Sequence, residues 1–331
     1  MKERSQSILV TGATGFLGAH LAAALHKAGH RVAALVRPDA DLVRLRLLAG
    51  PVELEICQLE DRAALTATIA RVAPETIFHL AGDTTARHFA GDWDVVDRAM
   101  SANVGNSLNV LRAAMQSGAP VRRIIRTGGL EEYGDGPKPA TESQALAPTS
   151  PYSASQASVT AWFNALQHHT DIMLTTLRPA LIYGPGQSAS FLIPTLIGTL
   201  LRGERFAMSQ GRQRRDLLYV DDMTRAFLLA GQRSDLGGET INICTGSAIE
   251  MRSVAQRIAT LLGASDLLDI GALGARPMDL EEVSGTNAKA AALLGWAPQV
   301  SLEDGLALTI ASGRQDTRTE ARERCGEIHA R

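Results

Sequence analysis

Hydrophobic residues recur with two different spacings along the first part of the chain. Short, near-continuous apolar runs are predicted at residues 8–10, 31–36, 52–57, 76–80, 121–126 and 174–182. Segments with apolar residues three or four positions apart lie between them, as in Leu17, Leu21 and Leu25. Fully buried parallel strands are apolar along their length, whereas amphipathic helices show the longer spacing. The alternation predicts an α/β fold, a doubly wound parallel sheet with helices on both faces.

A glycine-rich turn follows the first apolar run. Residues 11–18 read TGATGFLG, which places Gly12, Gly15 and Gly18 between a strand and a helix. In that setting the first glycine permits a tight turn, the second lets backbone N–H groups approach a pyrophosphate, and the third lets the helix pack on the strand. The helix N-terminus adds partial positive charge. The turn predicts a Rossmann-type dinucleotide-binding domain. Thr14, Phe16 and Leu17 complete the predicted cofactor loop.

The pattern changes after residue 183. Loops and a short apolar helix (191–201) follow, whereas 216–244 supply a further helix and a strand, and the chain from about 245 is helical in character. We therefore expect a dinucleotide-binding domain from 1–183 and about 216–244. A smaller, mostly helical substrate lobe would comprise about 184–215 and 245–312. Residues 313–331 read as a polar tail.

Composition narrows the class of protein. Of 331 residues, 45% are hydrophobic and 21% are charged, which are ordinary globular values. The net charge of −2 provides no basic footprint for nucleic acid or an anionic membrane. No segment is apolar enough for a membrane span or a signal peptide. Cys57, Cys244 and Cys325 are far apart, without metal-ligand spacing, and predict reduced thiols. We expect a cytoplasmic protein without a metal site.

The end of the second apolar run bears on the choice of cofactor. An acidic residue there would bind the ribose diol of NAD(H), whereas an arginine pairs with the 2′-phosphate of NADP(H). The run ends at Arg37, and Asp39 and Asp41 come only after Pro38. This order favours NADP(H) over NAD(H). The alternative is that Arg37 is a surface residue and one of the aspartates turns back to the ribose.

Further motifs follow the glycine turn in chain order. They are HLAG (79–82), Asn103, EEYG (131–134), SPYS (150–153), RP (178–179), YGPG (183–186), RDLLYVDD (215–222) and LGWAP (294–298). Together they resemble the extended short-chain dehydrogenases/reductases of the nucleotide-sugar epimerase/dehydratase group, from residue 11 to about 310. EEYG and SPYS look most like GDP-4-keto-6-deoxymannose reductases and their dehydratase relatives.

The resemblance implies roles for the matched residues. Tyr152 would transfer a proton at the sugar C4 oxygen, and Glu131 stands where dehydratase relatives place a base. Arg215 and Arg276 would hold the substrate diphosphate, which guanidinium forks suit. The alternatives are surface ion pairs for the arginines and a loop carboxylate for Glu131. The other implied cofactor-binding residues are Asp61, Leu80, Ala81, Gly82, Asn103 and Pro179, and Thr84 is the other substrate-binding residue.

The resemblance also implies a nucleotide-diphosphate sugar as substrate and a homodimer. Helices expected over 95–114 and 152–168 would pair across a two-fold axis. Their apolar residues Val110, Leu111, Trp162 and Leu166 are equally compatible with an internal core.

Two members of the family's catalytic set are absent. Gln156 stands four residues after Tyr152, where the family has a lysine, and Gly129 replaces a serine or threonine. A lysine charge at ~4 Å and an effective dielectric of ~20 would contribute roughly 4 kcal/mol. Gln156 can still bond the nicotinamide ribose but supplies no charge, so we expect Tyr152 to titrate near an ordinary phenol, with a pKa of about 10. Thr127, about 6.5 Å from residue 129 along the strand, would replace the missing hydroxyl only through a water or a shifted substrate.

A protonated tyrosine is a poor base for oxidising an alcohol but an acceptable acid for reducing a ketone. The sequence therefore predicts an NAD(P)-dependent 4-keto-sugar reductase with an atypical catalytic set of Tyr152, Gln156, Glu131 and Thr127. One alternative is a sugar epimerase or dehydratase. Another is a non-redox or catalytically weak protein that binds a dinucleotide or nucleotide sugar on the same scaffold.

Overall fold

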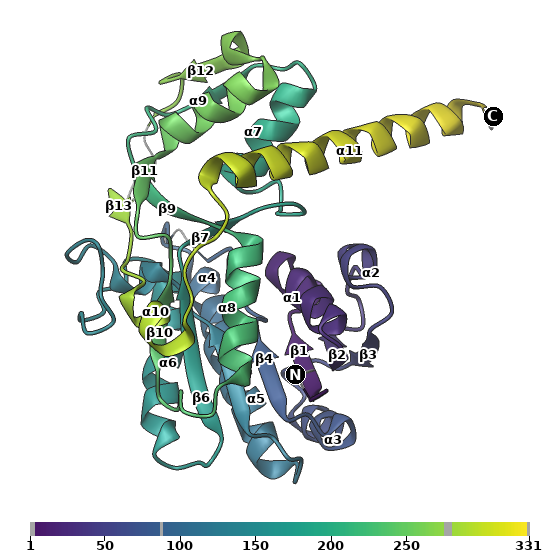
Figure 1. The fold of residues 1–331 in the computed structure, drawn as a ribbon, viewed down its shortest axis with the longest axis vertical. Helices are drawn as coiled ribbons and strands as arrows, with labels where there is room; N and C mark the ends of the chain where they lie inside the picture. Colours follow the sequence, from purple (N-terminus) through teal and green to yellow (C-terminus); the bar gives the residue numbers. More distant parts are fainter. Residues whose placement is uncertain (1–3, 87–88, 275–279, 330–331) are drawn as a thin grey trace.

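The computed structural model describes residues 4–86, 89–274 and 280–329. Its largest element is a seven-stranded sheet of order β10-β6-β5-β4-β1-β2-β3, in which all neighbours run parallel (Figure 1). The strands are β1 (Ser7–Thr11), β2 (Arg31–Val36), β3 (Glu53–Ile56), β4 (Thr76–His79), β5 (Arg123–Thr127), β6 (Met173–Pro179) and β10 (Thr240–Ile243). This sheet confirms the predicted α/β fold.

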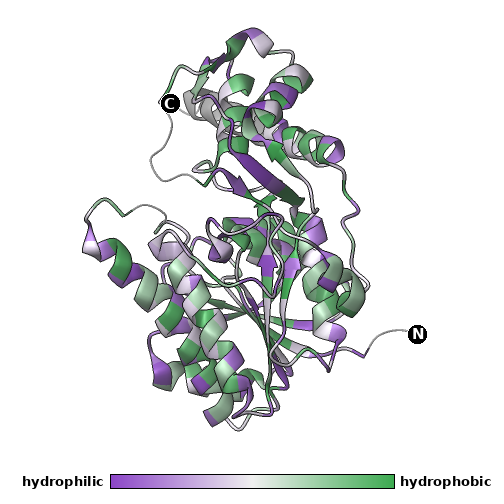
Figure 2. Cartoon of the chain, turned by 90° about the vertical axis from the view of Figure 1, so that its left-hand side faces the viewer, coloured by the Kyte–Doolittle hydropathy of each residue, from purple (hydrophilic) through white to green (hydrophobic). Residues whose placement is uncertain are grey.

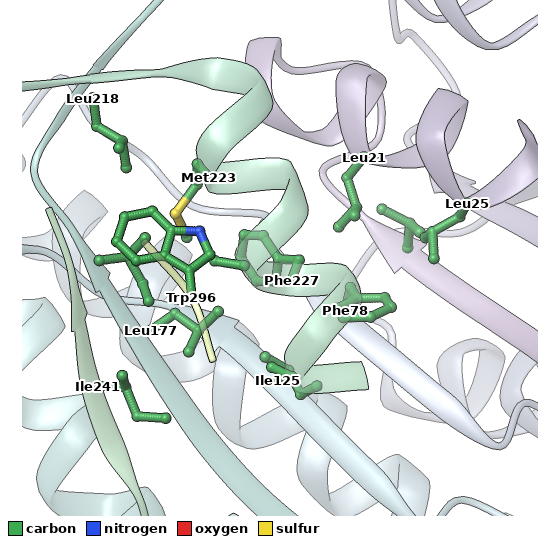
Figure 3. Close-up of a cluster of buried hydrophobic side chains, with 14 of the residues drawn as sticks. Leu21, Leu25, Phe78, Ile125, Leu177, Leu218, Met223, Phe227, Ile241 and Trp296 are labelled. Carbon is green, nitrogen blue, oxygen red and sulfur yellow. The ribbon is translucent and has the colours of Figure 1, made fainter. Parts of the chain in front are cut away.

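Helices cover both faces of this sheet. One core cluster joins it to α1 (Phe16–Lys27), α2 (Val43–Ala49) and α8 (Val220–Gln232), and a second joins it to α3 (Arg62–Val72), α5 (Asn106–Gln116) and α6 (Pro151–Gln167). Successive strand residues point to opposite faces, so Ile8 and Val10 enter the first cluster and Leu9 the second. Figure 3 shows Phe78 and Phe227 packed edge to face in the first cluster, with centroids 5.7 Å apart.

Two expected elements are interrupted. The helix predicted over 95–114 consists of α4 (Trp93–Ala99), a π-helical turn η1 (Met100–Gly105) and α5. Such turns often accompany functional sites, and this one contains the buried Asn103. The strand predicted over 174–182 is divided at Ala180. Its second part, β7 (Leu181–Tyr183), leaves the large sheet and pairs with β9 (Arg214–Tyr219).

The second lobe contains both helices and short strands, and Figure 2 shows it stacked above the larger one. Its elements are α7 (Leu192–Leu201), α9 (Met251–Leu262), η3 (Ser265–Leu267), the sheet of β7, β9, β11 (Ala248–Glu250) and β13 (Glu282–Val283), and the pair β8 (Phe206–Met208) and β12 (Leu268–Ile270). Strands β7 and β9 therefore lie in this lobe's sheet, although the expected boundaries put residues 181–183 and 216–219 in the first domain. Helix α8 packs on the large sheet, and β10 is its edge strand.

The motifs RDLLYVDD and LGWAP meet in the structure. The buried Asp222 carboxylate accepts bonds from the backbone N–H groups of Gln299 (3.0 Å) and Val300 (2.9 Å). Trp296 Nε1 donates to the Asp222 carbonyl (2.9 Å), and the Trp296 ring lies in the core, as Figure 3 shows. These contacts fix the segment after α10 (Ala288–Leu294) against α8.

The final helix continues into the predicted polar tail. It is α11 (Leu302–His329), which projects away from the body of the molecule (Figure 1). Within the described ranges, no helix combines the length and apolar character needed to cross a membrane.

Candidate active site

The glycine turn has the shape that its sequence predicts. Gly12 has φ +70°, and a Cβ there would lie 2.6 Å from Ala81 N and 2.7 Å from the Leu80 carbonyl carbon. A Cβ on Gly18 would overlap the Gly12 carbonyl. Gly15 caps α1 without a side chain, which leaves the N–H groups of the first helical turn available. The turn therefore fits a dinucleotide pyrophosphate.

His79 and Thr11 form hydrogen bonds at the base of this turn. The Thr11 hydroxyl lies 2.7 Å from His79 Nδ1 and accepts a bond from Ala81 N (3.3 Å), while His79 Nε2 lies 2.9 Å from the Ser107 hydroxyl. Burial, with a contribution from the Arg126 charge, lowers the pKa of His79 to about 3. His79 is thus a neutral bridge between β1, β4 and α5 at neutral pH.

The SPYS stretch caps α6 and positions Tyr152. The Ser150 hydroxyl accepts a bond from Ser153 N (3.1 Å), and Pro151 occupies the first turn, where its missing N–H costs nothing. Tyr152 N donates to the Ala86 carbonyl (2.8 Å), which ties the start of α6 to the loop after β4. Tyr152 is 9% exposed. Its position is therefore fixed by both the helix cap and the adjacent loop.

Three predicted cofactor residues meet one turn further along α6. Gln156 Nε2 would lie 3.9 Å from a Cβ on Gly82, and Asn103 Oδ1 would lie 2.9 Å from the same point. Asn103 Nδ2 also donates to the Ser155 hydroxyl (2.8 Å). The loop after β4, the π-helical turn and α6 thus converge beside the glycine turn.

There is space for a side chain at Gly129, where the family has a serine or threonine. Gly129 is extended (φ −170°), and the nearest neighbour of a Cβ there would be Glu131 N at 3.9 Å. Two residues earlier, the buried Thr127 Oγ1 has no hydrogen-bond partner in the described part of the chain. A buried hydroxyl is costly without a partner, so Thr127 fits a ligand oxygen. Its catalytic role stays a prediction.

Sequence reasoning missed a buried ionic cluster behind this position. Glu132, in η2 (Leu130–Tyr133), accepts bonds from Arg178 Nε (2.9 Å), the Thr160 hydroxyl (2.8 Å) and Gly129 N (2.9 Å). A Cβ on Gly128 would overlap the Glu132 carboxylate, so this glycine makes room for it. The signal available in the sequence was Arg126, a charged residue near the end of a strand that is predicted to be buried.

The remaining predicted residues lie around this centre. Glu131 is half-buried in η2, Pro179 is buried at the end of β6, and Thr84 is exposed in the loop after β4. Arg215, on β9 of the second lobe, is half-buried and donates to the Arg214 carbonyl (2.8 Å). Arg276 lies outside the described residues. The binding roles of these residues stay predictions.

Two predicted cofactor residues occupy exposed positions. The Asp61 carboxylate caps α3 by accepting a bond from Ala64 N (3.0 Å). Arg37, just after β2, lies 3.9 Å from Asp39 through Nε, and both side chains are more than 70% exposed. Their cofactor contacts stay predictions. Within the described residues, no group of three or more His, Cys, Asp or Glu side chains is arranged to hold a metal ion.

The parallel sheet, the glycine turn and the tyrosine at the start of α6 define an extended short-chain dehydrogenase/reductase. Residues 8–244 match the NAD dependent epimerase/dehydratase family, and the chain belongs to that family.

Individual relatives agree with this assignment. The chain is 31% identical to UDP-glucose 4-epimerase from Mycolicibacterium smegmatis, over 91% of this chain and 96% of the relative. The structure of UDP-glucose 4-epimerase from Thermotoga maritima, with UDP-glucose, is similar with a TM-score of 0.85 and 28% identity, over 94% and 99% of the two chains. MoeE5 in complex with UDP-glucose and NAD is similar with a TM-score of 0.83 and 28% identity, over the same shares.

Proposed function

We propose that this protein transfers hydride between a nicotinamide dinucleotide and C4 of a nucleotide-diphosphate sugar. The observation that carries the proposal is the convergence of Tyr152 and Gln156, one helical turn apart, on the loop that also supports Gly12. A sugar beside Tyr152 would therefore lie close to a dinucleotide bound over the glycine turn.

The residues present divide the chemistry among them. The bound dinucleotide would supply a hydride acceptor or donor. The Tyr152 hydroxyl would take or return the proton of the sugar C4 oxygen, and the Thr127 hydroxyl would donate a hydrogen bond to the same oxygen, directly or through a water. Arg215 would bind the diphosphate, since its guanidinium matches phosphate oxygens.

Epimerase or dehydratase chemistry is the better supported form of this reaction. The family description and the names of the relatives support it over the 4-keto-sugar reductase that the sequence favours. Both reactions begin by oxidising an alcohol, and therefore need a tyrosine that can act as a base. The 4-keto reductase is the second candidate, because Gln156 supplies no charge to lower the pKa of Tyr152.

The form of the dinucleotide is proposed from the end of β2. The exposed Arg37 side chain supports NADP(H), because its guanidinium suits a 2′-phosphate. Its neighbour Asp39 is also exposed, so their ion pair is weak. The family description and the MoeE5 complex support NAD(H). We keep NADP(H) as the proposal, which binding of both forms will test.

A homodimer is proposed from the surface of α4, η1 and α6. Val110 and Leu111, two of the predicted interface residues, lie instead in the core, at 1% and 3% exposure. Trp162 on α6 is 49% exposed. Trp93 on α4 is 68% exposed, and Met100 on η1 is 51% exposed. These large apolar side chains would be covered by a second copy.

A substrate panel tests the proposed function. The protein is incubated with UDP-glucose or UDP-galactose and each oxidised dinucleotide, and separately with GDP- and dTDP-4-keto-6-deoxy sugars and each reduced dinucleotide. Chromatography of the sugars and nicotinamide absorbance report the two reactions. Interconversion or dehydration supports the first candidate, and loss of reduced nicotinamide supports the second. Dinucleotide binding without any conversion would favour a non-redox protein.

A further inference from the structure

Arg126 is a buried cation in the central sheet, and it contacts the helix that carries Tyr152. It is 1% exposed and lies near the end of β5. Its Nη2 donates to Gln156 Oε1, and its Nη1 donates to the Thr160 hydroxyl (3.0 Å). Tyr152, Gln156 and Thr160 are spaced four residues apart and share one face of α6. The guanidinium therefore lies along the face that presents Tyr152.

The ionic cluster around Arg126 carries more positive than negative charge. It contains the guanidinium groups of Arg126 and Arg178 and the carboxylate of Glu132. That carboxylate is bonded to Arg178, Thr160 and Gly129 N. Burial lowers the pKa of Arg126 to about 10, against the opposing effects of Glu132 and Tyr152. Arg126 therefore remains charged at neutral pH, and its charge interacts with Tyr152.

The other charged groups near Tyr152 come from several elements. Tyr152 packs with Val95 and Ala99 of α4, whose Asp94, Asp97 and Arg98 are exposed, and Asp83 of the loop after β4 lies 3.8 Å from Arg98. The remaining groups are Glu131 and Glu132 in η2, Arg178 on β6 and the neutral His79 on β4.

We propose that Arg126 supplies Tyr152, from strand β5, with the positive charge that the family's lysine would supply from helix α6, and that Gln156 holds its guanidinium in place. The proposal rests on the proposed function for its catalytic meaning. Arg126 is a positioning residue, because it acts on the tyrosine through the charge and contacts neither sugar nor dinucleotide in our account.

This arrangement changes what Gln156 implies. A cation near the phenol favours the phenolate and lowers its pKa. The charge of Arg126 therefore lowers the pKa of Tyr152, whereas the sequence alone predicts a phenol without such a charge beside it. A tyrosine of that kind can accept a proton from a sugar alcohol, so Gln156 no longer argues against epimerase or dehydratase chemistry.

Titration of Tyr152 without any substrate tests the proposal. Phenolate absorbance is followed against pH in the wild-type protein and in Tyr152→Phe, and the difference reports Tyr152. Burial raises the pKa values of the other three tyrosines, Tyr133, Tyr183 and Tyr219, so Tyr152 should ionise first. We expect Tyr152 to ionise at a lower pH than these three buried tyrosines, and ionisation of Tyr152 together with or after them would overturn the proposal.

Charge relocation gives the second measurement. Arg126→Gln should raise the pKa of Tyr152 by about one unit or more, and adding Gln156→Lys to it should reverse the rise. Arg126→Lys should keep the pKa close to the wild-type value. Arg123→Gln, on the same strand, is the matched control and should leave the titration unchanged. Equal shifts in Arg126→Gln and Arg123→Gln would overturn the proposal. If Arg126→Gln does not fold, the wild-type titration decides.

The role of Arg126 and the proposed function can be contradicted independently. A lowered Tyr152 pKa without turnover of any nucleotide sugar would support the role of Arg126 and contradict the proposed function. Turnover of a nucleotide sugar without a lowered Tyr152 pKa would support the proposed function and contradict the role of Arg126.

Discussion

Arg178 on β6 holds the Glu132 carboxylate with two nitrogens, Nε at 2.9 Å and Nη2 at 2.8 Å from the same oxygen. The two side chains are 3% and 0% exposed. Each charge has lost its hydration, so each depends on the other and on the surrounding hydrogen bonds. The pair fixes η2, and with it Gly129 and Glu131, against the large sheet.

Breaking this pair should be costly. Glu132→Gln leaves the Arg178 charge buried without its carboxylate, and we expect the free energy of unfolding to fall by about 3–5 kcal/mol. Denaturant unfolding measures it. Glu204→Gln is the control, because its ion pair with Arg202 is about half exposed and screened by water, and should leave stability nearly unchanged. Comparable small losses in both variants would contradict the structural role given to Glu132.

The two adjacent glycines should respond differently to a hydroxyl. Gly129→Ser has open space and extended backbone, so the protein should fold normally. If the serine replaces the missing donor, turnover should rise by about 10²-fold. Gly128→Ser would place its Cβ against Glu132, Thr176 and Arg178, and should lower the melting temperature by several degrees. Equal melting temperatures of the two variants would contradict the close packing around residue 128.

Arg37 should decide between the two dinucleotides. Arg37→Ala removes the cation expected at the 2′-phosphate, so affinity for NADPH should fall at least about tenfold, or about 1.4 kcal/mol. Affinity for NADH should change little. Fluorescence titration of both dinucleotides measures the two effects, with the exposed Arg205→Ala as a surface control. Unchanged NADPH binding in Arg37→Ala would assign the ribose contact to another residue and remove the support for NADP(H).

His79 should make the protein sensitive to mild acid. Its pKa is about 3 in the folded protein and 6.5 in the unfolded chain, so the unfolded chain binds more protons between these values. Stability from this group is therefore complete above pH 6.5 and is lost as the pH falls towards 3. Between about pH 7 and pH 5, the wild-type protein should lose about 2 kcal/mol more than His79→Gln. Parallel pH profiles of the two proteins would mean that His79 is not buried in its neutral form.

The sequence predicted the parts of the structure that depend on local patterns. The apolar runs predicted the parallel sheet, and Gly12 and Gly18 predicted a turn in which no Cβ fits. The short strands β8, β11, β12 and β13 were not predicted, because runs of two or three residues carry no periodicity. The expected boundary at about residue 216 cuts through β9, whose pairing with β7, β11 and β13 places it in the second lobe, because the partners of a short strand cannot be recognised from its own residues.

The candidate site was less predictable, because its charges come from separate elements. Arg126, Glu132 and Arg178 belong to β5, η2 and β6, and only the fold brings them together. The sequence showed that a lysine is missing beside Tyr152. It could not show that Arg126 approaches Gln156 from a neighbouring strand, since the two residues are 30 positions apart.

The central claim is that hydride passes between the sugar and the dinucleotide. The most direct test uses the nucleotide sugar that the panel selects, deuterated at C4, or for a keto sugar the dinucleotide deuterated at the nicotinamide C4. Mass spectrometry of the recovered molecules then locates the deuterium. We predict that the wild-type protein keeps the deuterium out of solvent: it returns to C4 in an epimerisation, moves to C6 in a 4,6-dehydration, and passes from the dinucleotide to C4 of the sugar in a ketone reduction. The rate should be much lower with Tyr152→Phe. Loss of the deuterium to solvent during conversion of the sugar would contradict hydride transfer.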